Sequence, residues 1–341
     1  MLPGVSTSEL YHSGLDSMWP RVSHRLLSEV WKRFAVACAW IAILAPHSAH
    51  AQQFQNPPLL TTASDPIGVV AGDWNGDGHQ DIAYVTTGKS AVLHVLLGNG
   101  KGGFTEGTDV QLPTGACTYE LTTCRLTVAD FNKDGHPDIL MSGNFPSGWG
   151  FLVLPGNGDG TFGSPIVSVV PASYNAGLAT YVPYQIAVAD FNGDRNLDIV
   201  APDYYDGQIH IYLGDGKGGF TAGNTYYDSY QPYAIYTSDV NHDGNADLIV
   251  FNEYGNGAYG NGGAAIWLGN GTGNFTLMQT YPTSGGTTFA VRTVADMNGD
   301  GNVDVVGGDA LGDVLVMTGK SDGSFKEPLI NPSFSRTQEK I

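Results

Sequence analysis

The sequence DFNGDRNLD, residues 190–198, is one of five near-copies of an acidic loop, and this repetition sets the fold class. The other copies are DWNGDGHQD (73–81), DFNKDGHPD (130–138), DVNHDGNAD (239–247) and DMNGDGNVD (296–304). Each copy has Asp, Asn and Asp at positions 1, 3 and 5, and a further Asp at position 9. Four copies have Gly at position 6, whereas the copy at 190 has Arg195. Such regular self-similarity indicates an architecture built from repeated structural units.

A second shared element follows each acidic loop, in the same order every time. The five copies are HVLLGNGKGGF (94–104), FLVLPGNGDGTF (151–162), IHIYLGDGKGGF (209–220), AIWLGNGTGNF (265–275) and VLVMTGKSDGSF (314–325). Each unit therefore contains four short runs of β-branched and aromatic residues bounded by Gly, Asn and Asp, which predicts four strands. No segment shows sustained helical periodicity. Four-stranded units repeating every 50–60 residues predict the blades of a β-propeller.

These paired elements resemble the FG-GAP or VCBS-type repeats, which are similar to the repeats of integrin α-subunit propellers. The resemblance covers about 270 residues. It implies an all-β propeller that holds calcium in the first loop of each blade. Integrin-like propellers have seven blades, whereas this chain has five recognisable four-stranded units. Five lies within the usual range for a closed ring, and an incomplete or open array of the seven-bladed type is the alternative.

The repeats divide the chain into segments. We expect a signal peptide at 1–51, an N-terminal segment at 52–63, a propeller at 64–333 and a C-terminal tail at 334–341. Within the propeller, the expected repeats are 64–112, 113–170, 171–228, 229–284 and 285–333. Both FQNPPLLTT (54–62) and FKEPLINPS (325–333) read as outer strands, and a closed ring needs only one of them to complete its last blade.

The side chains of the acidic loops are those that calcium prefers. Asp, Asn and Asp at positions 1, 3 and 5 turn three oxygen ligands toward one point, position 7 adds a backbone carbonyl, and the Asp at position 9 closes the shell. All-oxygen ligation favours Ca²⁺ over Zn²⁺, and flexible geometry favours it over Mg²⁺. The alternative is a set of ordinary Asp/Asn/Gly turns, which five matched copies argue against. The predicted side-chain ligands for up to five Ca²⁺ are Asp73, Asn75, Asp77, Asp81, Asp130, Asn132, Asp134, Asp138, Asp190, Asn192, Asp194, Asp198, Asp239, Asn241, Asp243, Asp247, Asp296, Asn298, Asp300 and Asp304.

Two further observations concern the strength of these sites. Of the 30 acidic residues after position 51, 15 lie in the five loops, so repulsion among carboxylates would destabilise a metal-free fold. Position 6 must turn sharply, and Arg195 would strain the third loop if its backbone is left-handed. We therefore expect a weaker third site.

The N-terminal region predicts export. Basic residues from Arg21 to Arg33 precede the apolar run FAVACAWIAIL (34–44), and Ala49 and Ala51 form an A-x-A motif. This pattern is typical of a signal peptide, here cleaved after Ala51, although Met18 could be the true start and a retained anchor is the alternative. The apolar run is too short to span a bilayer, and no other stretch could, so we expect no membrane span after cleavage. The protein should be secreted, extracellular or at the cell surface, with the periplasm as another option.

Two cysteines, Cys117 and Cys124, remain after removal of the signal peptide. An even number of cysteines in an exported chain predicts a disulfide, with two free thiols as the alternative.

Several function classes receive little support. The formal charge of −18 opposes nucleic-acid binding. GNGKGG (98–103) and GDGKGG (214–219) fit a dinucleotide-binding pattern, but each precedes a predicted strand and not a helix. The sequence has no G-x-S-x-G elbow and no pairing of cysteine with histidine that suggests a nucleophile.

The predicted topology places the acidic loops and the glycine-rich turns at one rim of the propeller. The second loop of each blade and the connection to the next blade lie at the opposite rim, and they differ from blade to blade. Thirteen of 17 tyrosines lie between 174 and 259, and many are expected there. Tyr suits the binding of proteins or sugars, although it also favours strands and packing between blades. The candidate residues of this binding rim are Trp149, Tyr181, Tyr204, Tyr205, Tyr230, Tyr233, Tyr254 and Tyr259.

We therefore expect a calcium-binding propeller that acts as a binding or adhesion module for a protein or a surface glycan. The alternatives are an enzyme, a lyase or hydrolase acting on polysaccharides, and a structural part of a cell-envelope assembly. An enzyme of that kind would need an acid/base pair or a basic cleft, and the 11 Lys and Arg residues after position 51 show no clustering. An enzyme is therefore the less favoured reading.

Overall fold

The computed structural model describes residues 65–86, 91–117, 124–170, 185–204, 206–228, 231–255, 260–282, 291–308, 314–326 and 329–331. The predictions for the signal peptide (1–51), the N-terminal segment (52–63) and the tail (334–341) lie outside the described residues.

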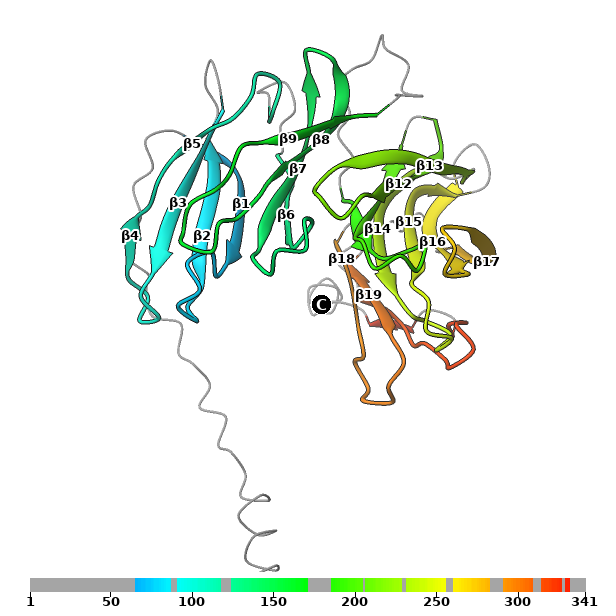
Figure 1. Cartoon of the computed structure of the whole chain (residues 1–341). Coiled ribbons are helices and arrows are strands. Elements are labelled where there is room, and N and C mark those ends of the chain that lie inside the picture. The colour runs from blue at the N-terminus through cyan, green and yellow to red at the C-terminus, as the bar shows by residue number, and fades with distance from the viewer. Residues whose placement is uncertain are drawn as a thin grey trace, which may run out of the picture. The chain divides into compact units, whose positions relative to one another are not determined.

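The described residues form five antiparallel sheets, each built from consecutive strands (Figure 1). The sheets are called blades 1 to 5 below. Blade 1 contains β1 (Pro66–Gly72), β2 (Asp81–Thr86), β3 (Val92–Gly98), β4 (Phe104–Glu106) and β5 (Val110–Gln111). Blade 2 contains β6 (Leu126–Ala129), β7 (Asp138–Phe145), β8 (Gly148–Leu154) and β9 (Ile166–Val169). Blade 3 contains β10 (Ala187–Ala189), β11 (Asp198–Asp203), β12 (Gln208–Gly214) and β13 (Phe220–Tyr227).

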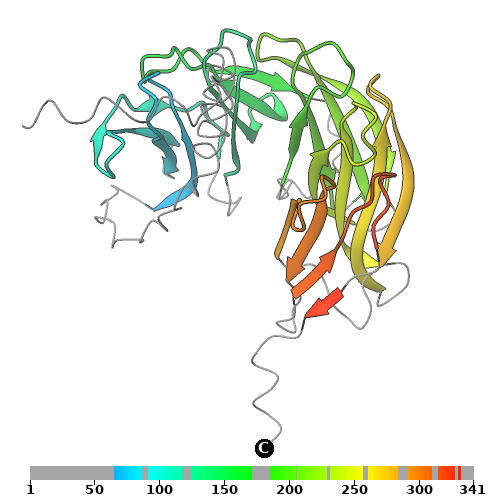
Figure 2. The same ribbon diagram turned by 90° about the horizontal axis from the view of Figure 1, so that it is seen from below.

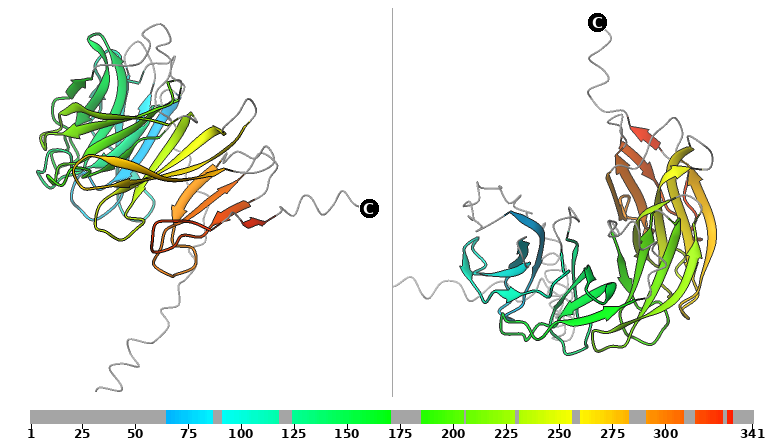
Figure 3. Two further views of the ribbon diagram at one scale, coloured as in Figure 1. Left: turned by 90° about the vertical axis from the view of Figure 1, so that its right-hand side faces the viewer. Right: turned by 90° about the horizontal axis from the view of Figure 1, so that it is seen from above.

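Blade 4 contains β14 (Pro232–Ser238), β15 (Asp247–Gly255), β16 (Gly260–Gly269) and β17 (Phe275–Pro282), and Figure 2 shows these as the long yellow-green to gold strands. Blade 5 contains β18 (Val291–Ala295), β19 (Asp304–Gly308), β20 (Val314–Met317) and β21 (Leu329–Asn331), orange to red in Figure 3. The predicted all-β propeller of five four-stranded blades is confirmed.

The outer position of the sheet is filled differently in blades 1 and 5. In blade 1, β4 and β5 both pair with β3, so together they fill the outer position as one interrupted strand. In blade 5, β21 pairs with β20 through Leu329 and Val316. β21, which lies within the expected segment 325–333, therefore supplies the outer strand of the last blade, and the segment at 54–62 is not needed for that position.

Consecutive blades pack face to face through apolar side chains that alternate along the strands. Four buried clusters join blade 1 to 2, 2 to 3, 3 to 4 and 4 to 5. In the first, Leu93 and Val95 of blade 1 meet Ile139 of blade 2, and all three are almost fully buried. Each blade thus buries a face that one sheet alone would leave in water.

Hydrogen bonds at one rim repeat between the blades. In blades 2, 3 and 4, the third glycine of the glycine-rich turn donates its N–H to the position-2 carbonyl of the acidic loop in the preceding blade, whereas the equivalent Gly323 of blade 5 donates to Lys320 in its own turn. The N···O distances are 2.9 Å for Gly160 to Trp74, 3.2 Å for Gly218 to Phe131 and 2.7 Å for Gly273 to Phe191. The same position-2 side chains pack on the aromatic residue that ends the next turn, in the pairs Trp74–Phe162, Phe131–Phe220 and Phe191–Phe275. The acidic loops therefore link each blade to its successor.

Candidate metal centres and binding rim

All five acidic loops share one hydrogen-bond pattern. In the loop at 73–81, Asp73 Oδ2 accepts the Gly78 N–H at 2.9 Å, Asn75 Oδ1 accepts the Asp77 N–H at 3.0 Å, and Asp77 Oδ1 accepts the N–H of position 7 at 2.8 Å. The loops at 130, 190, 239 and 296 repeat these three bonds within about 0.2 Å. Side chains at positions 1, 3 and 5 thus gather around one tight turn, as local Asx hydrogen bonding favours.

The aspartate at position 9 has a structural role that the sequence analysis did not assign. Asp81 is fully buried at the start of β2. Its Oδ2 accepts the Trp74 N–H at 3.0 Å, and its Oδ1 accepts the Gly98 N–H from the end of β3 at 2.7 Å. Asp138, Asp198, Asp247 and Asp304 make the same two bonds in their own blades. Each of these carboxylates therefore joins the acidic loop to the glycine-rich turn.

The donor set at positions 1, 3 and 5 fits a hard cation. All the donors are carboxylate or amide oxygens, and an oxygen that accepts one N–H keeps a second lone pair. The position-3 amide, however, donates its Nδ2 to the position-5 carboxylate, as from Asn75 to Asp77 at 3.1 Å. Within the part of the chain that the structure describes, no three acidic, histidine or cysteine side chains converge as a metal cage. Among the predicted ligands, position 9 fits least, since its side chain is fully buried and its oxygens bind backbone amides of two separate segments.

Burial and hydrogen bonding shift the pKa values of the loop aspartates in opposite directions. Desolvation raises the pKa of Asp198 to about 6, against opposing hydrogen bonds from Gly214 and Phe191. Desolvation likewise raises the pKa of Asp138 and Asp247. The exposed position-5 carboxylate of Asp243 has a lowered pKa, chiefly because it accepts the Asn245 N–H. A cation in the loop would offset the cost of charge at the buried position.

The backbone of the acidic loops is left-handed at two positions. Position 6 has φ of +82° at Gly78 and +67° at Arg195, so the condition for strain at Arg195 is met. Position 4 is also left-handed, and there Lys133 (+64°) and His242 (+60°) stand where the other loops have glycine. The sequence analysis missed position 4, although its glycine in three of the five copies was a usable signal.

The second loops and the connections between blades lie together at the opposite rim. Ala116, in the connection from blade 1 to blade 2, pairs with Gly143 near the end of β7. Asp228, in the connection from blade 3 to blade 4, donates its N–H to the carbonyl of Gly207 in the β11–β12 turn at 2.7 Å. The first of these connections contains a disulfide between Cys117 and Cys124, whose Cα atoms are 5.0 Å apart.

The structure describes the side chains of three of the eight predicted rim residues. Tyr204 is half-buried in the turn after β11. Trp149 packs on Phe151 and Tyr212, with ring centroids 5.0 and 6.2 Å apart, and so lies between blades 2 and 3. Tyr233 stacks beneath the Arg292 guanidinium at 4.4 Å. Tyr181, Tyr205, Tyr230 and Tyr259, and the side chain of Tyr254, lie outside the described residues.

Other tyrosines serve contacts between blades. The hydroxyl oxygen of Tyr226 accepts the Phe275 N–H of blade 4 at 2.9 Å, and that of Tyr281 accepts the Phe325 N–H of blade 5 at 2.8 Å. Tyr236 donates its hydroxyl to the carbonyl of Arg292 at 2.7 Å. Part of the tyrosine enrichment is therefore explained by packing, which was the alternative to binding.

Two histidines that had no place in the sequence analysis occupy equivalent positions on the third strands of blades 1 and 3. His94 lies 3.0 Å from Thr86 Oγ1 and 2.9 Å from the Asp109 carboxylate. His210 lies 3.0 Å from Thr225 Oγ1 and 3.8 Å from the Asp203 carboxylate. Each imidazole connects strands within its own blade. In the sequence, the signal that relates the two histidines is their position, four residues before the first glycine of the glycine-rich turn.

Comparison with known proteins identifies the family of this repeat. A sequence model described as "FG-GAP-like repeat" matches residues 73–141, 190–250 and 256–307, more than half of the chain. No curated protein matches the sequence. None of the elements in the described residues is a helix able to cross a bilayer.

Solved structures share the fold at low identity. A candidate 6-phosphogluconolactonase from Bacteroides uniformis is 12% identical, with a TM-score of 0.51 over 81% of this chain and 74% of that one. The six-bladed fucose-binding lectin of Aleuria aurantia is 13% identical, with a TM-score of 0.42 over 78% of each chain. These similarities concern the propeller architecture and not the chemistry of a site.

Proposed function

Because the chain belongs to the FG-GAP-like repeat family, we propose that it is an exported, calcium-binding propeller that acts as a binding or adhesion module for a protein or surface glycan. One observation carries this proposal. One rim repeats the same acidic loop and hydrogen bonds five times, whereas the second loops and connections at the other rim differ in every blade. Repetition suits a stabilising role, and variation on a rigid scaffold suits recognition.

The calcium assignment is supported by the oxygen donors at positions 1, 3 and 5, held in the same arrangement in all five blades. When bound, the ion's two positive charges would offset two of the three carboxylate charges in each loop. The loops of blades 1, 2 and 3 also contact the next blade through their position-2 carbonyls. Metal binding would therefore stabilise the packing of neighbouring blades.

The recognition role rests on the half-buried side chains of Tyr204 and Asp206 at the variable rim, next to the buried Asp203. An aromatic ring near an accessible carboxylate can stack on the apolar face of a sugar while that carboxylate accepts a hydroxyl proton. The same features suit the polar contacts of a protein partner. Trp149 and Tyr233, which pack between blades, contribute to the support of this rim.

A glycan array probed with the chain from residue 52 onward, with and without Ca²⁺, tests the proposal directly. We expect selective binding in calcium that is lost in chelator. No binding to any glycan in either condition would contradict the glycan branch. Capture of a single protein partner from the cell surface, abolished by chelator, would then support the other branch.

Matched substitutions separate recognition from stability. Replacing Tyr204 and Tyr205 with alanine should weaken binding by an amount on the order of 1 kcal/mol or more for each contact, with little change in Tm. Replacing Asp239 and Asp243 with alanine should lower Tm first, because these residues belong to the acidic rim. Tyrosine variants that melt early and still bind normally would place recognition elsewhere on the molecule.

A further inference from the structure

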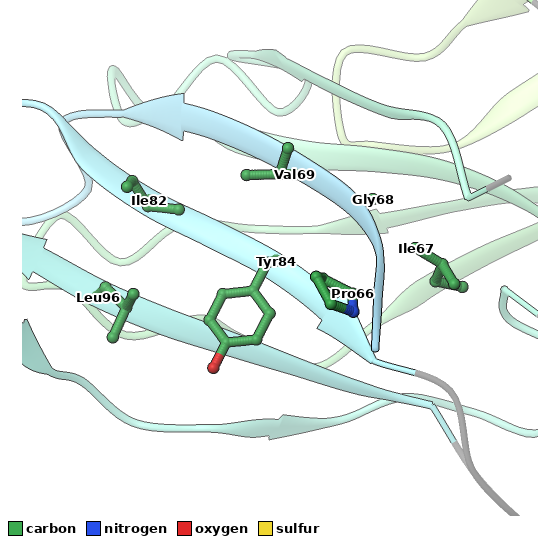
Figure 4. A pocket seen from close by; sticks show the side chains of 7 residues that line it. All are labelled: Pro66, Ile67, Gly68, Val69, Ile82, Tyr84 and Leu96. Carbon is green, nitrogen blue, oxygen red and sulfur yellow. The ribbon is translucent and has the colours of Figure 1, made fainter. Parts of the chain in front are cut away.

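Blades 1 and 5 each have one exposed face whose equivalent is buried in the other four blades. In all blades, the face toward the next blade in the chain is called the forward face, and the opposite one the rear face. The rear face of blade 1 contains Val69, Ile82, Tyr84 and Leu96, which line a pocket of about 450 Å³ (Figure 4). The forward face of blade 5 contains Met297, Val314 and Val316.

Equivalent positions show what normally covers a rear face. Ile82 follows the position-9 aspartate and is partly exposed, whereas its equivalents Ile139, Ile199, Leu248 and Val305 are fully buried against the preceding blade. Val69 is 66% exposed, while its equivalent Ile235 in blade 4 is fully buried. Leu96 is also partly exposed, and its equivalents Leu154 and Met317 are fully buried. The pocket on blade 1 is therefore half of a blade interface.

The forward face of blade 5 is the other half. Met297, at position 2 of its acidic loop, is 60% exposed, whereas the equivalent residues Trp74, Phe131, Phe191 and Val240 are buried by the next blade. Val314 is 46% exposed, and its equivalents Leu93, Phe151, Ile209 and Ala264 are buried. The residues keep the apolar character of an interface, although nothing covers them in the described part of the chain.

The glycine-rich turn of blade 1 also differs from those of the other blades in what lies next to it. A methyl group placed on the third turn glycine of blades 2, 4 and 5 (Gly160, Gly273 and Gly323) would meet an acidic-loop side chain of the preceding blade within 3.6 Å. One placed on Gly102, the equivalent in blade 1, would meet nothing within 4 Å. The turn of blade 1 thus lacks the acidic loop that the other turns contact.

From this continuity with the four existing interfaces, we propose that the rear face of blade 1 binds the forward face of blade 5 in a second copy of this chain. The contact is heterologous, because two different faces meet head to tail. Among the described residues, none covers either face, so each copy can offer one face and accept the other. This proposal does not depend on calcium binding or on the ligand of the variable rim.

Charge placed on either face should block this association. Val69→Glu and Val314→Glu change exposed side chains, so each variant should keep the wild-type Tm. We expect the molar mass of the wild type, measured by light scattering after gel filtration, to rise with concentration to at least twice that of one chain. Each variant should remain at the mass of one chain. Leu277→Glu, at a residue of blade 4 that is 44% exposed, is the matched control and should associate as the wild type does.

A mixing experiment tests the head-to-tail geometry. Val69→Glu retains a normal forward face on blade 5, and Val314→Glu retains a normal rear face on blade 1. An equimolar mixture should therefore form a species of twice the mass of one chain and nothing larger. If Val69→Glu lowers Tm, Val69→Ser replaces it in both measurements.

Three results would overturn the proposal. One is a wild-type chain that stays at the mass of one copy over the whole concentration range, which would indicate that the two faces close on each other within one chain. The second is association of the glutamate variants with wild-type strength. The third is a mixture that shows no doubling of mass.

Discussion

Arg195 occupies a backbone conformation that four of the five acidic loops give to glycine. Its φ of +67° puts a side chain in the left-handed region, and its N–H still reaches Asp190 at 2.7 Å. A methyl group on the equivalent glycines of blades 1, 2, 4 and 5 would meet no atom within 4 Å. The cost of Arg195 is therefore conformational and not a steric clash with neighbours.

Arg195→Gly should relieve this conformational cost. The left-handed penalty is about 1–2 kcal/mol, and the greater freedom of glycine in the unfolded chain offsets about half of it. We expect a higher Tm and tighter calcium binding at the third loop, measured by calorimetry. Gly244→Arg is the reverse control and should weaken the fourth loop. Five equal sites in the wild-type titration would show that the strain argument is wrong.

At the scale of an element, the position-9 aspartates matter because they join three parts of a blade. Each starts a second strand and accepts N–H groups from the acidic loop and from the end of the third strand. In Asp138 these bonds come from Phe131 and Gly156, both at 2.8 Å. The other acidic-loop aspartates bond only within their own loop.

Asp138→Asn should destabilise the protein even in chelator. One amide N–H₂ would then face a backbone N–H, and a buried donor without an acceptor costs about 1–3 kcal/mol. Asp134→Asn is the control in the same loop, since its exposed side chain should change Tm little without metal and lower calcium affinity when metal is present. Chemical denaturation in EDTA compares the two variants. Equal free energies of unfolding for them in EDTA would reject the structural role of position 9.

The disulfide between Cys117 and Cys124 belongs to the same scale. It closes a loop with a sequence separation of 7, for which chain entropy gives a stabilisation of about 2–3 kcal/mol. In exported protein, neither cysteine should react with iodoacetamide until a reductant is added, and the double Ser variant should melt earlier. Alkylation of both residues without reduction would show free thiols.

At the scale of the whole molecule, the acidic loops are both candidate metal sites and links between blades. Chelation should therefore lower Tm cooperatively, because an ion that binds only the native state contributes RT ln(1 + [L]/Kd) per site. Calcium should restore Tm more than magnesium does, measured by scanning calorimetry. A Tm that is the same with EDTA and with calcium would refute the calcium assignment.

The local features of this protein were determined by its sequence. The acidic loops and the glycine-rich turns depend on hydrogen bonds and torsion angles within about ten residues, and each strand pairs with its neighbour in the chain. Because the pattern recurs five times, the number of blades could be predicted from the sequence. Even the left-handed position 6 followed from the contrast between Arg195 and its glycine equivalents.

Only the tertiary structure decided which residues serve contacts between blades. Tyr226 and Phe275 are 49 positions apart, and no local pattern indicates that one hydroxyl accepts the other's N–H. The structural role of Asp81 became visible only because the structure places its carboxylate beside Gly98 at the end of β3. The exposure of Met297 and Val69 is unusual only in comparison with their buried equivalents in the other blades. Such contacts depend on where distant segments meet, and a sequence read one segment at a time carries no direct record of those positions.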